Sequence, residues 1–212
     1  RAPLTNLMGK AQLTLSRQRP PHEYKAVLES NTEELERLAR IVSDMLFLAQ
    51  VSHPAARASF TEVSLAQEAQ RVMELFALSA EDKHVTLSLR GDAWVTGDRL
   101  MIQRAISNLL SNAIRHTPEA STVLLLVETY EQSVSLSVGN PGRGIEAHHL
   151  PHLFERFYRA DSSRTRAEGG TGLGLAIVKS IMHLHQGHAH VTSQPGRFTR
   201  FSLVFPQGAC AL

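Results

Sequence analysis

The first candidate site consists of two asparagines one helical turn apart. Asn108 and Asn112 lie in a segment whose apolar residues recur every three or four positions, and residues four apart share one face of a helix. Two amide oxygens on one face can ligate Mg²⁺, a hard cation that prefers oxygen and retains waters and phosphate oxygens. Arg115 and His116 follow on the same helix and could contact phosphate. Taken alone, the pattern also fits an amphipathic helix with solvated asparagines.

A segment with two glycines, at the end of a strand pattern, is the second candidate. Gly142 and Gly144 follow Asn140 and precede Ile145. Glycine permits backbone conformations closed to other residues and lets a ligand approach the chain closely. The Asn-Pro-Gly run is also strong turn chemistry, so a plain turn is the alternative interpretation.

The third candidate is a glycine-rich segment that leads directly into a helix pattern. Its residues are Gly170, Thr171, Gly172, Leu173, Gly174 and Leu175. Exposed backbone N–H groups at a helix N-terminus make an anion site that suits phosphate. The segment lacks the Gly-Lys-Ser/Thr of a P-loop and does not show the Gly-x-Gly-x-x-Gly spacing of a dinucleotide fingerprint after a strand. On its own it favours phosphate without naming the ligand.

Helices and strands must position these segments, and periodicity predicts where they lie. Apolar residues three and four apart predict helices over 4–15, 24–49, 65–80, 100–114 and 173–185. Alternation predicts strands over 60–65, 85–89, 94–96, 123–127, 134–138, 191–193 and 201–205. Residues 139–172 lack a long periodic run and predict a long loop, which in a compact domain is usually functional or disordered. Three helices against a mixed or antiparallel sheet give an α+β fold.

Residues 1–51 form a separate unit, a helical hairpin broken at Pro20-Pro21. A heptad seam runs along its second helix through Tyr24, Leu28, Asn31, Leu35, Leu38, Val42, Met45 and Ala49. Two helices cannot bury such a seam alone, so it favours a homodimer that forms a four-helix bundle. Packing on the rest of the same chain is the alternative. Asn31 could fix the register of the seam or lie at the helix edge facing water.

The rest of the chain divides into a linker and a second domain, and its composition excludes some classes of protein. Residues 52–59 contain a proline and read as a linker, and residues 60–207 as the second domain. Of 212 residues, 42% are hydrophobic and 20% charged, which argues against disorder. The net charge of +2, without clustered Lys or Arg, argues against nucleic-acid binding. The one cysteine, Cys210, cannot form a disulfide within the chain.

In this order, the three candidate segments resemble the N, G1 and G2 boxes of the ATPase domain shared by histidine kinases, Hsp90-type chaperones, type II topoisomerases and mismatch-repair ATPases. Between the last two, Leu153-Phe154-Glu155-Arg156-Phe157-Tyr158-Arg159-Ala160-Asp161 resembles the F box of histidine kinases. Arg1-Ala2-Pro3-Leu4-Thr5-Asn6 resembles the tail of their H box, His-Glu-Leu-Arg-x-Pro-Leu. The resemblance covers essentially the whole chain. It implies the core of a bacterial sensor histidine kinase, with a dimerisation hairpin followed by a Bergerat-type α/β sandwich. Residues 139–182 most resemble the heavy-metal (copper, silver, zinc) responsive sensors.

The resemblance implies that the chain binds ATP and Mg²⁺. Asn112 would ligate the metal, with Asn108 beside it near the phosphates. Arg115 and His116 would contact the triphosphate or the ribose. Asn140 would accept a hydrogen bond from the adenine amino group.

The lid and the closing strand complete the implied site. Phe154, Phe157 and Arg159 would anchor a mobile lid, and Arg159 joins Asn108 and Asn112 as a candidate catalytic residue because it could meet the γ-phosphate. The remaining cofactor contacts would come from Gly142, Gly144, Ile145, Gly170, Thr171, Gly172, Leu173, Gly174, Leu175 and Thr199.

Four features depart from the family pattern. Asn140 stands where the family usually has an Asp, and an amide oxygen lacks the charge that makes such a hydrogen bond strong, so we expect weaker adenine binding. The phosphoacceptor His would lie three residues before Arg1, so we expect this chain to bind nucleotide without phosphorylating itself. Ala2 replaces the Thr or Asn of many relatives, which puts phosphatase activity in doubt. Phe198 interrupts the usual glycine-rich G3 pattern.

The implied function is ATP-dependent phosphoryl transfer to a histidine and then to an aspartate of a response-regulator receiver domain. The implied setting is a homodimer through residues 1–51, at the cytoplasmic face of the bacterial inner membrane, anchored by segments outside this chain. One alternative is an ATPase of the chaperone or topoisomerase type, against which residues 1–51 and the F box argue. The other is a non-catalytic dimer scaffold, which only Asn140 supports.

The histidines outside these motifs are interpreted as surface or core residues. They include His148, His149 and His152 in the lid, and His183, His185, His188 and His190 near the last helix. A metal site formed by the first three is an alternative, although they show no strong ligand spacing.

Overall fold

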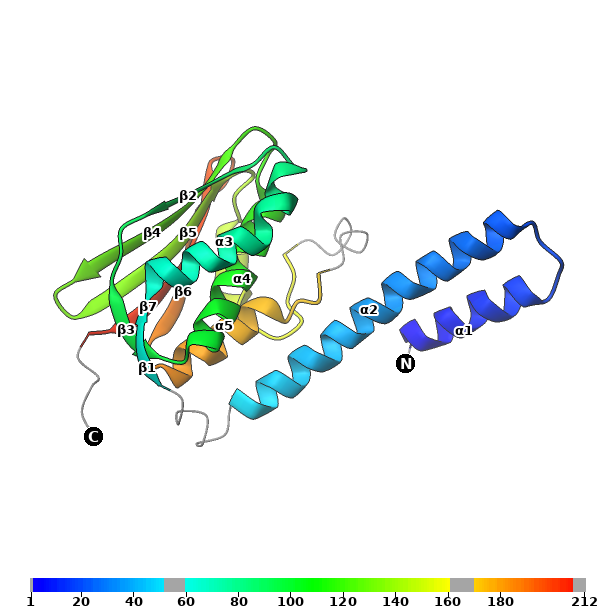
Figure 1. Ribbon diagram of the computed structural model, residues 1–212, viewed down its shortest axis with the longest axis horizontal. Helices are drawn as coiled ribbons and strands as arrows, with labels where there is room; N and C mark the ends of the chain where they lie inside the picture. Colours follow the sequence, from blue (N-terminus) through cyan, green and yellow to red (C-terminus); the bar gives the residue numbers. More distant parts are fainter. Residues whose placement is uncertain (1, 52–59, 161–169, 208–212) are drawn as a thin grey trace.

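A helical hairpin projects from a compact domain in the computed structural model of the chain (Figure 1). The structure describes residues 2–51, 60–160 and 170–207. The hairpin consists of α1 (Ala2–Leu15) and α2 (Pro21–Val51). Proline is favoured at the first helical position because its missing N–H is not needed there, so Pro21 starts α2 rather than breaking it. Across the hairpin, the Lys10 ammonium donates to the Ser30 hydroxyl over 3.2 Å.

The domain packs helices on one face of a mixed five-stranded sheet, as the α+β prediction required. Its elements are β1 (Thr61–Ser64), α3 (Leu65–Glu81), β2 (Thr86–Arg90), β3 (Trp94–Gly97), α4 (Arg99–His116), β4 (Thr122–Tyr130), β5 (Ser133–Pro141), the short 3-10 helix η2 (Ala147–His152), α5 (Gly174–Leu184), β6 (His188–Gln194) and β7 (Phe198–Pro206). The sheet order is β2-β4-β5-β7-β6, with β2 and β4 parallel and the other neighbours antiparallel. Strands β1 and β3 form a separate antiparallel pair.

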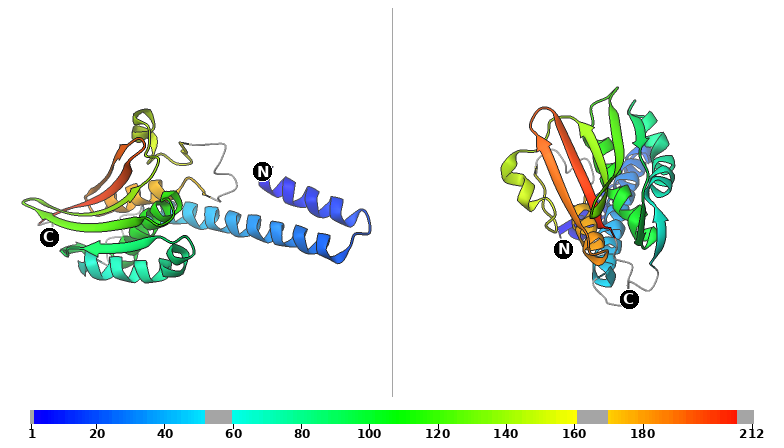
Figure 2. Two further views of the ribbon diagram at one scale, coloured as in Figure 1. Left: turned by 90° about the horizontal axis from the view of Figure 1, so that it is seen from above. Right: turned by 90° about the vertical axis from the view of Figure 1, so that its left-hand side faces the viewer.

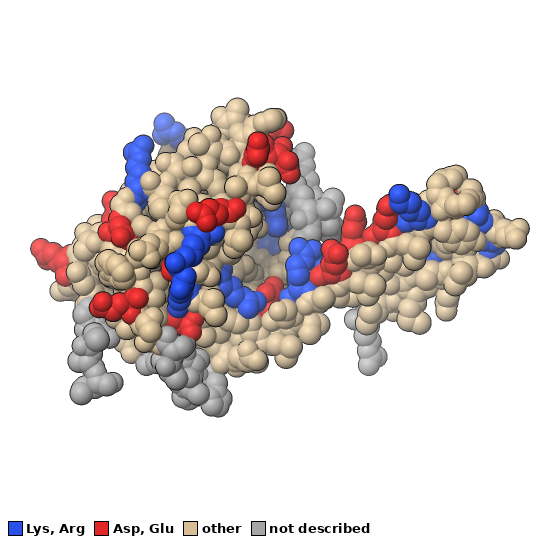
Figure 3. Space-filling model, in the orientation of Figure 1, with Lys and Arg blue, Asp and Glu red and all other residues tan. Residues whose placement is uncertain are grey.

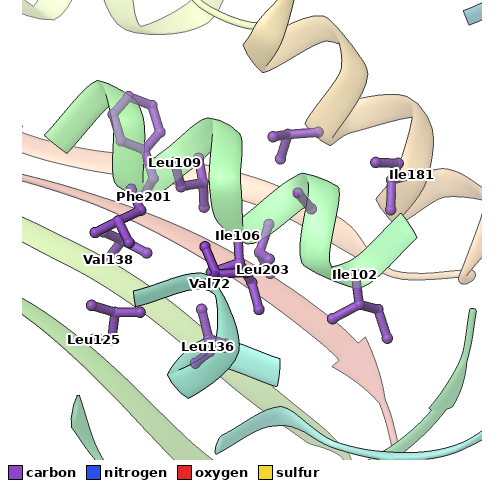
Figure 4. Close-up of a cluster of buried hydrophobic side chains, with 14 of the residues drawn as sticks. Val72, Ile102, Ile106, Leu109, Leu125, Leu136, Val138, Ile181, Phe201 and Leu203 are labelled. Atoms are coloured by element: carbon purple, nitrogen blue, oxygen red, sulfur yellow. The ribbon is translucent and has the colours of Figure 1, made fainter. Parts of the chain in front are cut away.

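The core lies between the sheet and α3, α4 and α5 (Figure 4). Alternate residues of β4 and β5 point into it, and Leu125 and Leu136 are fully buried there. Helix α4 contributes Ile102, Ile106 and Leu109, which recur at helical spacing and are at most 1% exposed. This apolar stripe fixes the rotation of α4 about its axis, because any other rotation would expose it to water.

Polar contacts at the ends of the helices hold α4 in place. The Asp98 carboxylate caps the helix by accepting from the Met101 N–H over 2.9 Å. Buried His185, at the end of α5, accepts from the Asp98 N–H at Nε2 over 3.0 Å, and its Nδ1 lies 2.7 Å from the Ile181 carbonyl. Buried Glu68 of α3 accepts from the Arg99 Nε over 3.0 Å at the start of α4. The position of α4 is therefore set from both neighbouring helices.

The last turns of α2 pack against the domain (Figure 2). Leu48 and Val51 are 3% and 5% exposed, and Leu48 belongs to the main hydrophobic core. Toward the start of the same helix, Leu28, Leu35 and Val42 of the predicted seam are 66%, 54% and 56% exposed. The alternative that the hairpin packs on its own chain is thus correct for the end of α2, while most of the seam is open.

The structure corrects the prediction for residues 139–172 and leaves several other positions undescribed. Residues 139–172 are not one long loop: β5 continues to Pro141, and η2 occupies Ala147–His152. Periodicity missed the 3-10 helix because so short an element shows no amphipathic repeat. The linker 52–59, Cys210, Asp161 at the end of the F box and the side chain of Ala2 lie outside the described residues.

Truncation of Ile106 should destabilise the domain. Ile106 is 0% exposed between α4 and the sheet, so Ile106→Ala should lower the free energy of unfolding by about 3 kcal/mol through lost burial and a residual cavity. Leu100→Ala is the matched control, because Leu100 lies on the same helix and is 74% exposed. Urea denaturation measures both variants. Equal effects of the two substitutions would contradict the packing of α4.

Candidate functional site

The polar face of α4 forms one wall of the site. Arg104, Asn108 and Asn112 follow one another at intervals of four and lie away from the buried stripe. The Asn108 Nδ2 donates to the Arg104 carbonyl over 3.0 Å. A Cβ at Gly174 would lie 2.8 Å from the Asn108 Oδ1, so α5 begins directly against this amide. The structure therefore places the side chain of Asn108 against the glycine-rich segment that starts α5.

The C-terminal end of α4 carries Arg115 and His116 into the site. The Lys83 ammonium donates to the Ile114 and Arg115 carbonyls over 2.8 and 2.6 Å, which satisfies groups left open at a helix end. A Cβ at Gly170 would lie 2.9 Å from the Arg115 Nη1, and one at Gly142 would lie 2.9 Å from the His116 carbonyl oxygen. The sequence did not predict this role of Lys83, because the residue lies in a turn 31 and 32 positions before the carbonyls that it contacts and belongs to no motif.

Asn140 lies near the end of β5, on the side of the sheet that faces the helices. It is 7% exposed and pairs with Thr199 of β7. Its Nδ2 donates to the Pro141 carbonyl over 2.9 Å, which turns the Oδ1 to the opposite side as an acceptor. The orientation of the Asn140 amide is therefore set by its own neighbour in the chain.

The segment after Asn140 is tied to β6. The Ile145 N–H donates to the Ser193 Oγ over 2.8 Å, and the Ser193 and Thr199 hydroxyls lie 2.8 Å apart. Gly144 adopts a φ of +67°, and a Cβ there would collide with the Gln194 carbonyl oxygen. A side chain at this position is excluded twice over, by conformation and by space.

The F-box residues contact the glycine-rich segment directly. The Phe157 N–H donates to the Gly172 carbonyl over 2.9 Å, and Phe157 itself has a φ of +64°, which is strained for a non-glycine residue. Phe154 meets Phe201 of β7 edge to face, with ring centroids 6.2 Å apart. Phe154 thus contacts β7, and Phe157 contacts the glycine-rich segment.

Arg159 faces the glycine-rich segment. Its Nη1 donates to the Gly170 carbonyl over 3.1 Å, and its Nη2 is buried without a partner among the described residues. Arg115 and Arg159 thus both approach Gly170, which concentrates positive charge beside the start of α5. Such a combination attracts phosphate.

The N-terminus of α5 completes this anion-binding region. The Thr171 hydroxyl accepts from the Leu173 N–H over 3.3 Å. Leu173 is fully buried and Leu175 packs against the core, so the side chains of these two residues anchor the segment. Basic side chains gather around a hollow where the domain meets α2, the stalk helix (Figure 3).

The lid histidines contact side chains of the same segment. No group of three or more His, Cys, Asp or Glu residues within residues 2–51, 60–160 and 170–207 could hold a metal ion. His149 Nδ1 lies 2.7 Å from the Tyr158 hydroxyl, and His152 Nδ1 lies 2.8 Å from Glu155. On β6, burial and then the neighbouring His188 lower the pKa of His190.

The structure brings the three sequence motifs and the F box to one place. Asn140 and Gly142 lie at the His116 end of α4, and the glycine-rich segment lies beside Arg115 and Asn108. Residues 97–209 match the family of histidine kinase-, DNA gyrase B- and HSP90-like ATPases, and residues 1–54 match the His Kinase A (phospho-acceptor) domain. The chain belongs to the sensor histidine kinases. Membership in this ATPase family implies ATP binding.

Several curated sensor proteins are similar to this chain over nearly its whole length. It is 47% identical over 207 residues to sensor histidine kinase CusS of Escherichia coli, covering 97% of the chain and 43% of the relative. It is 44% identical over 209 residues to sensor protein IrlS of Burkholderia pseudomallei, covering 99% and 45%. Against sensor protein CzcS of Cupriavidus metallidurans the identity is 40%, with 97% and 43% covered. The chain spans less than half the length of these relatives.

Solved histidine kinases have the same fold. The Acinetobacter baumannii histidine kinase AdeS superposes with a TM-score of 0.77 at 23% identity, over 97% of this chain and 95% of that one. Histidine kinase ThkA, in complex with the response regulator protein TrrA, superposes with a TM-score of 0.75 at 24% identity, over 96% and 57%. The hairpin and the domain thus follow one another as in these structures.

Restoring a carboxylate at position 140 should strengthen adenine binding. Asn140→Asp keeps the shape of the side chain and adds a charge to the acceptor, so we expect nucleotide affinity to rise about fivefold. Calorimetric titration with ADP measures the change, and guanosine diphosphate, which offers a carbonyl in place of the adenine amino group, is the control ligand. Unchanged ADP affinity would remove Asn140 from the account of adenine recognition.

Proposed function

We propose that this chain binds Mg-ATP and transfers the γ-phosphoryl group to a histidine, from which it passes to an aspartate of a response regulator. The observation that carries the proposal is the convergence of Asn108, Arg115 and Arg159 on the glycine-rich segment that starts α5. The match of residues 1–54 to the phospho-acceptor domain supports histidine as the acceptor. It also favours a kinase over the chaperone and topoisomerase types of the ATPase family.

The residues present fit a bound magnesium ion. Within the described part of the chain, no hydrogen-bond partner satisfies the Asn112 amide, whose oxygen is therefore available as a ligand. Asn112 lies one turn from Asn108 on the polar face of α4. When bound, the ion would neutralise charge on the phosphate oxygens. Arg115, about one turn beyond Asn112 on α4, and Arg159 of the F box would hold the triphosphate in place.

Catalysis in this proposal consists mainly of positioning and charge stabilisation. Phosphoryl transfer requires little covalent work from the protein, since the attacking group, the phosphorus and the leaving oxygen need only be aligned. The glycine-rich segment brings backbone N–H groups close to the phosphates. Phe154 and Phe157 fix the lid on β7 and on Gly172, which keeps Arg159 close to the site.

The hairpin supplies the dimer interface in this proposal. The exposed seam residues Leu28, Leu35, Val42 and Met45 line one side of α2, and an open groove of about 690 Å³ lies beside Tyr24 and Leu28. Within the described chain, the Asn31 Oδ1 is buried without a partner, which suits pairing across a dimer. The receiver domain would dock on the same helix pair.

The proposal places this core in a longer, membrane-anchored sensor at the cytoplasmic face of the bacterial inner membrane. The relatives are more than twice as long as the matched region. Across residues 2–51, 60–160 and 170–207, none of the helices combines the length and apolar character needed to cross a bilayer. We also propose a heavy-metal input, which the resemblance of residues 139–182 to metal-responsive sensors implies.

Nucleotide binding should depend on Asn112 and Mg²⁺. We expect ATP and ADP to bind in the micromolar range, more tightly with Mg²⁺, and Asn112→Ala to weaken ATP binding about a hundredfold through loss of a metal ligand. Calorimetric titration measures these affinities. Gln70→Ala is the matched control, since it removes an exposed amide from α3. No binding under any condition would favour the non-catalytic scaffold.

The chain should be a dimer through α2. Leu35→Asp places a charge in the exposed seam and should weaken dimerisation at least about tenfold, because the charge would lose water in the bundle. Sedimentation velocity over a concentration series measures the dissociation constant. Leu75→Asp on α3, where Leu75 is 79% exposed, should leave the dimer intact. A monomeric unaltered chain, or equal effects of the two variants, would contradict the interface.

A further inference from the structure

An ion pair joins the stalk helix to the nucleotide site. Asp44 of α2 accepts at Oδ1 a hydrogen bond of 2.8 Å from the Arg104 Nη2 of α4. Its second oxygen, Oδ2, accepts a longer bond of 3.5 Å from the Thr171 hydroxyl. The Asp44 carboxylate therefore lies between a guanidinium on α4 and a hydroxyl of the glycine-rich segment, two elements that form opposite sides of the proposed phosphate site.

Arg104 belongs to the face of α4 that forms the site. It precedes Asn108 by one turn, and its carbonyl accepts from the Asn108 Nδ2. Along α4, the order runs from His116, next to Gly142 at the adenine end, through Asn112 and Asn108 to Arg104 at the stalk end. A triphosphate whose base lies at Asn140 therefore extends along this helix toward Arg104.

The groups that hold Asp44 have the chemistry of a phosphoryl site. A guanidinium forms charge-assisted hydrogen bonds to carboxylate and phosphate alike. The Arg104 guanidinium is held in place by the Phe47 ring of α2, whose centroid lies 3.8 Å from its Cζ. The Thr171 hydroxyl also accepts from the Leu173 N–H at the start of α5, so it sits among backbone donors suited to an anion.

We propose that Arg104 and Thr171 form the subsite for the terminal phosphoryl group of ATP, and that Asp44 occupies this subsite in the docked arrangement of the stalk. The inference rests on the proposed function and adds residues and regulation to the same site. A carboxylate and a phosphoryl group compete for the same donors, so the γ-phosphate displaces Asp44. Binding of the triphosphate then releases α2 from α4, whereas a diphosphate leaves the Asp44 contact in place.

Calorimetric titrations of β,γ-imidoadenosine triphosphate and of ADP, each with Mg²⁺, test the proposal on the whole chain. Asp44→Asn removes the competing charge while keeping the shape of the side chain. We expect it to tighten binding of the triphosphate analogue about fivefold and to leave ADP binding unchanged within about twofold. Glu29→Gln is the matched control, because this exposed carboxylate lies on the same helix and pairs with Lys25 at 3.7 Å.

Substitution of Arg104 should have the opposite effect to Asp44→Asn and weaken binding of the triphosphate analogue. Arg104→Met should weaken binding of the triphosphate analogue about tenfold with little effect on ADP, and Arg104→Lys should recover part of the loss. In the Arg104→Met background, Asp44→Asn should give no further gain, because the two groups act on one subsite. Thermal unfolding of each variant distinguishes loss of the subsite from loss of the fold.

Two outcomes would overturn the inference, and they are distinguishable. If Asp44→Asn shifts both nucleotides equally, or neither, while binding still requires Asn112, the phosphoryl subsite is wrong and the proposed kinase function stands. If neither nucleotide binds to the unaltered chain or to Asp44→Asn, the proposed function fails and the inference fails with it.

Discussion

The rotation of α4 about its own axis is the constraint on which the site depends. Burial of Ile102, Ile106 and Leu109 between the sheet and α5 stabilises one rotation, and every polar residue on the opposite side is then placed without further adjustment. Arg104, Asn108, Asn112 and Arg115 lie on this opposite side at intervals of three and four. The cap at Asp98, the buried Glu68 and His185 therefore matter to function through α4, although none of the three lies in the site.

Most of the fold and the chemistry of the site follow from the sequence because both are encoded locally. Alternation over Val134–Val138 and helical spacing over Leu100–Ile114 predicted β5 and α4, which the structure extends by one residue at the start and by three and two residues at the end. The glycines at 170, 172 and 174 precede a helix predicted over 173–185, and α5 spans Gly174–Leu184. Motif residues far apart in the sequence converge because each one ends or begins an element of the same core, and the ends of packed elements meet at one edge.

The contacts that the sequence did not predict join residues without a local pattern. Asp44 and Arg104 are 60 positions apart, and Lys83 reaches carbonyls 31 and 32 positions away. Each of these side chains reads as a solvated charge on an ordinary helix or loop, which is the commoner fate of such residues. The orientation of the Asn140 amide was also beyond the sequence, because it depends on where the Pro141 carbonyl points.

Helix α2 has two sides of different character, an exposed seam and a side that packs on the domain. The seam residues Val42 and Met45 are exposed on one side, while Leu48 and Val51 are buried against the domain, and Asp44 and Phe47 contact Arg104 on that second side. Because these residues lie within three turns of one continuous helix, the two sides cannot turn independently. A rotation of α2 that alters the packing of the seam must also move Asp44 and Phe47 relative to α4. The stalk is therefore mechanically connected to the nucleotide site through the side chains of Asp44 and Phe47, which pack on Arg104.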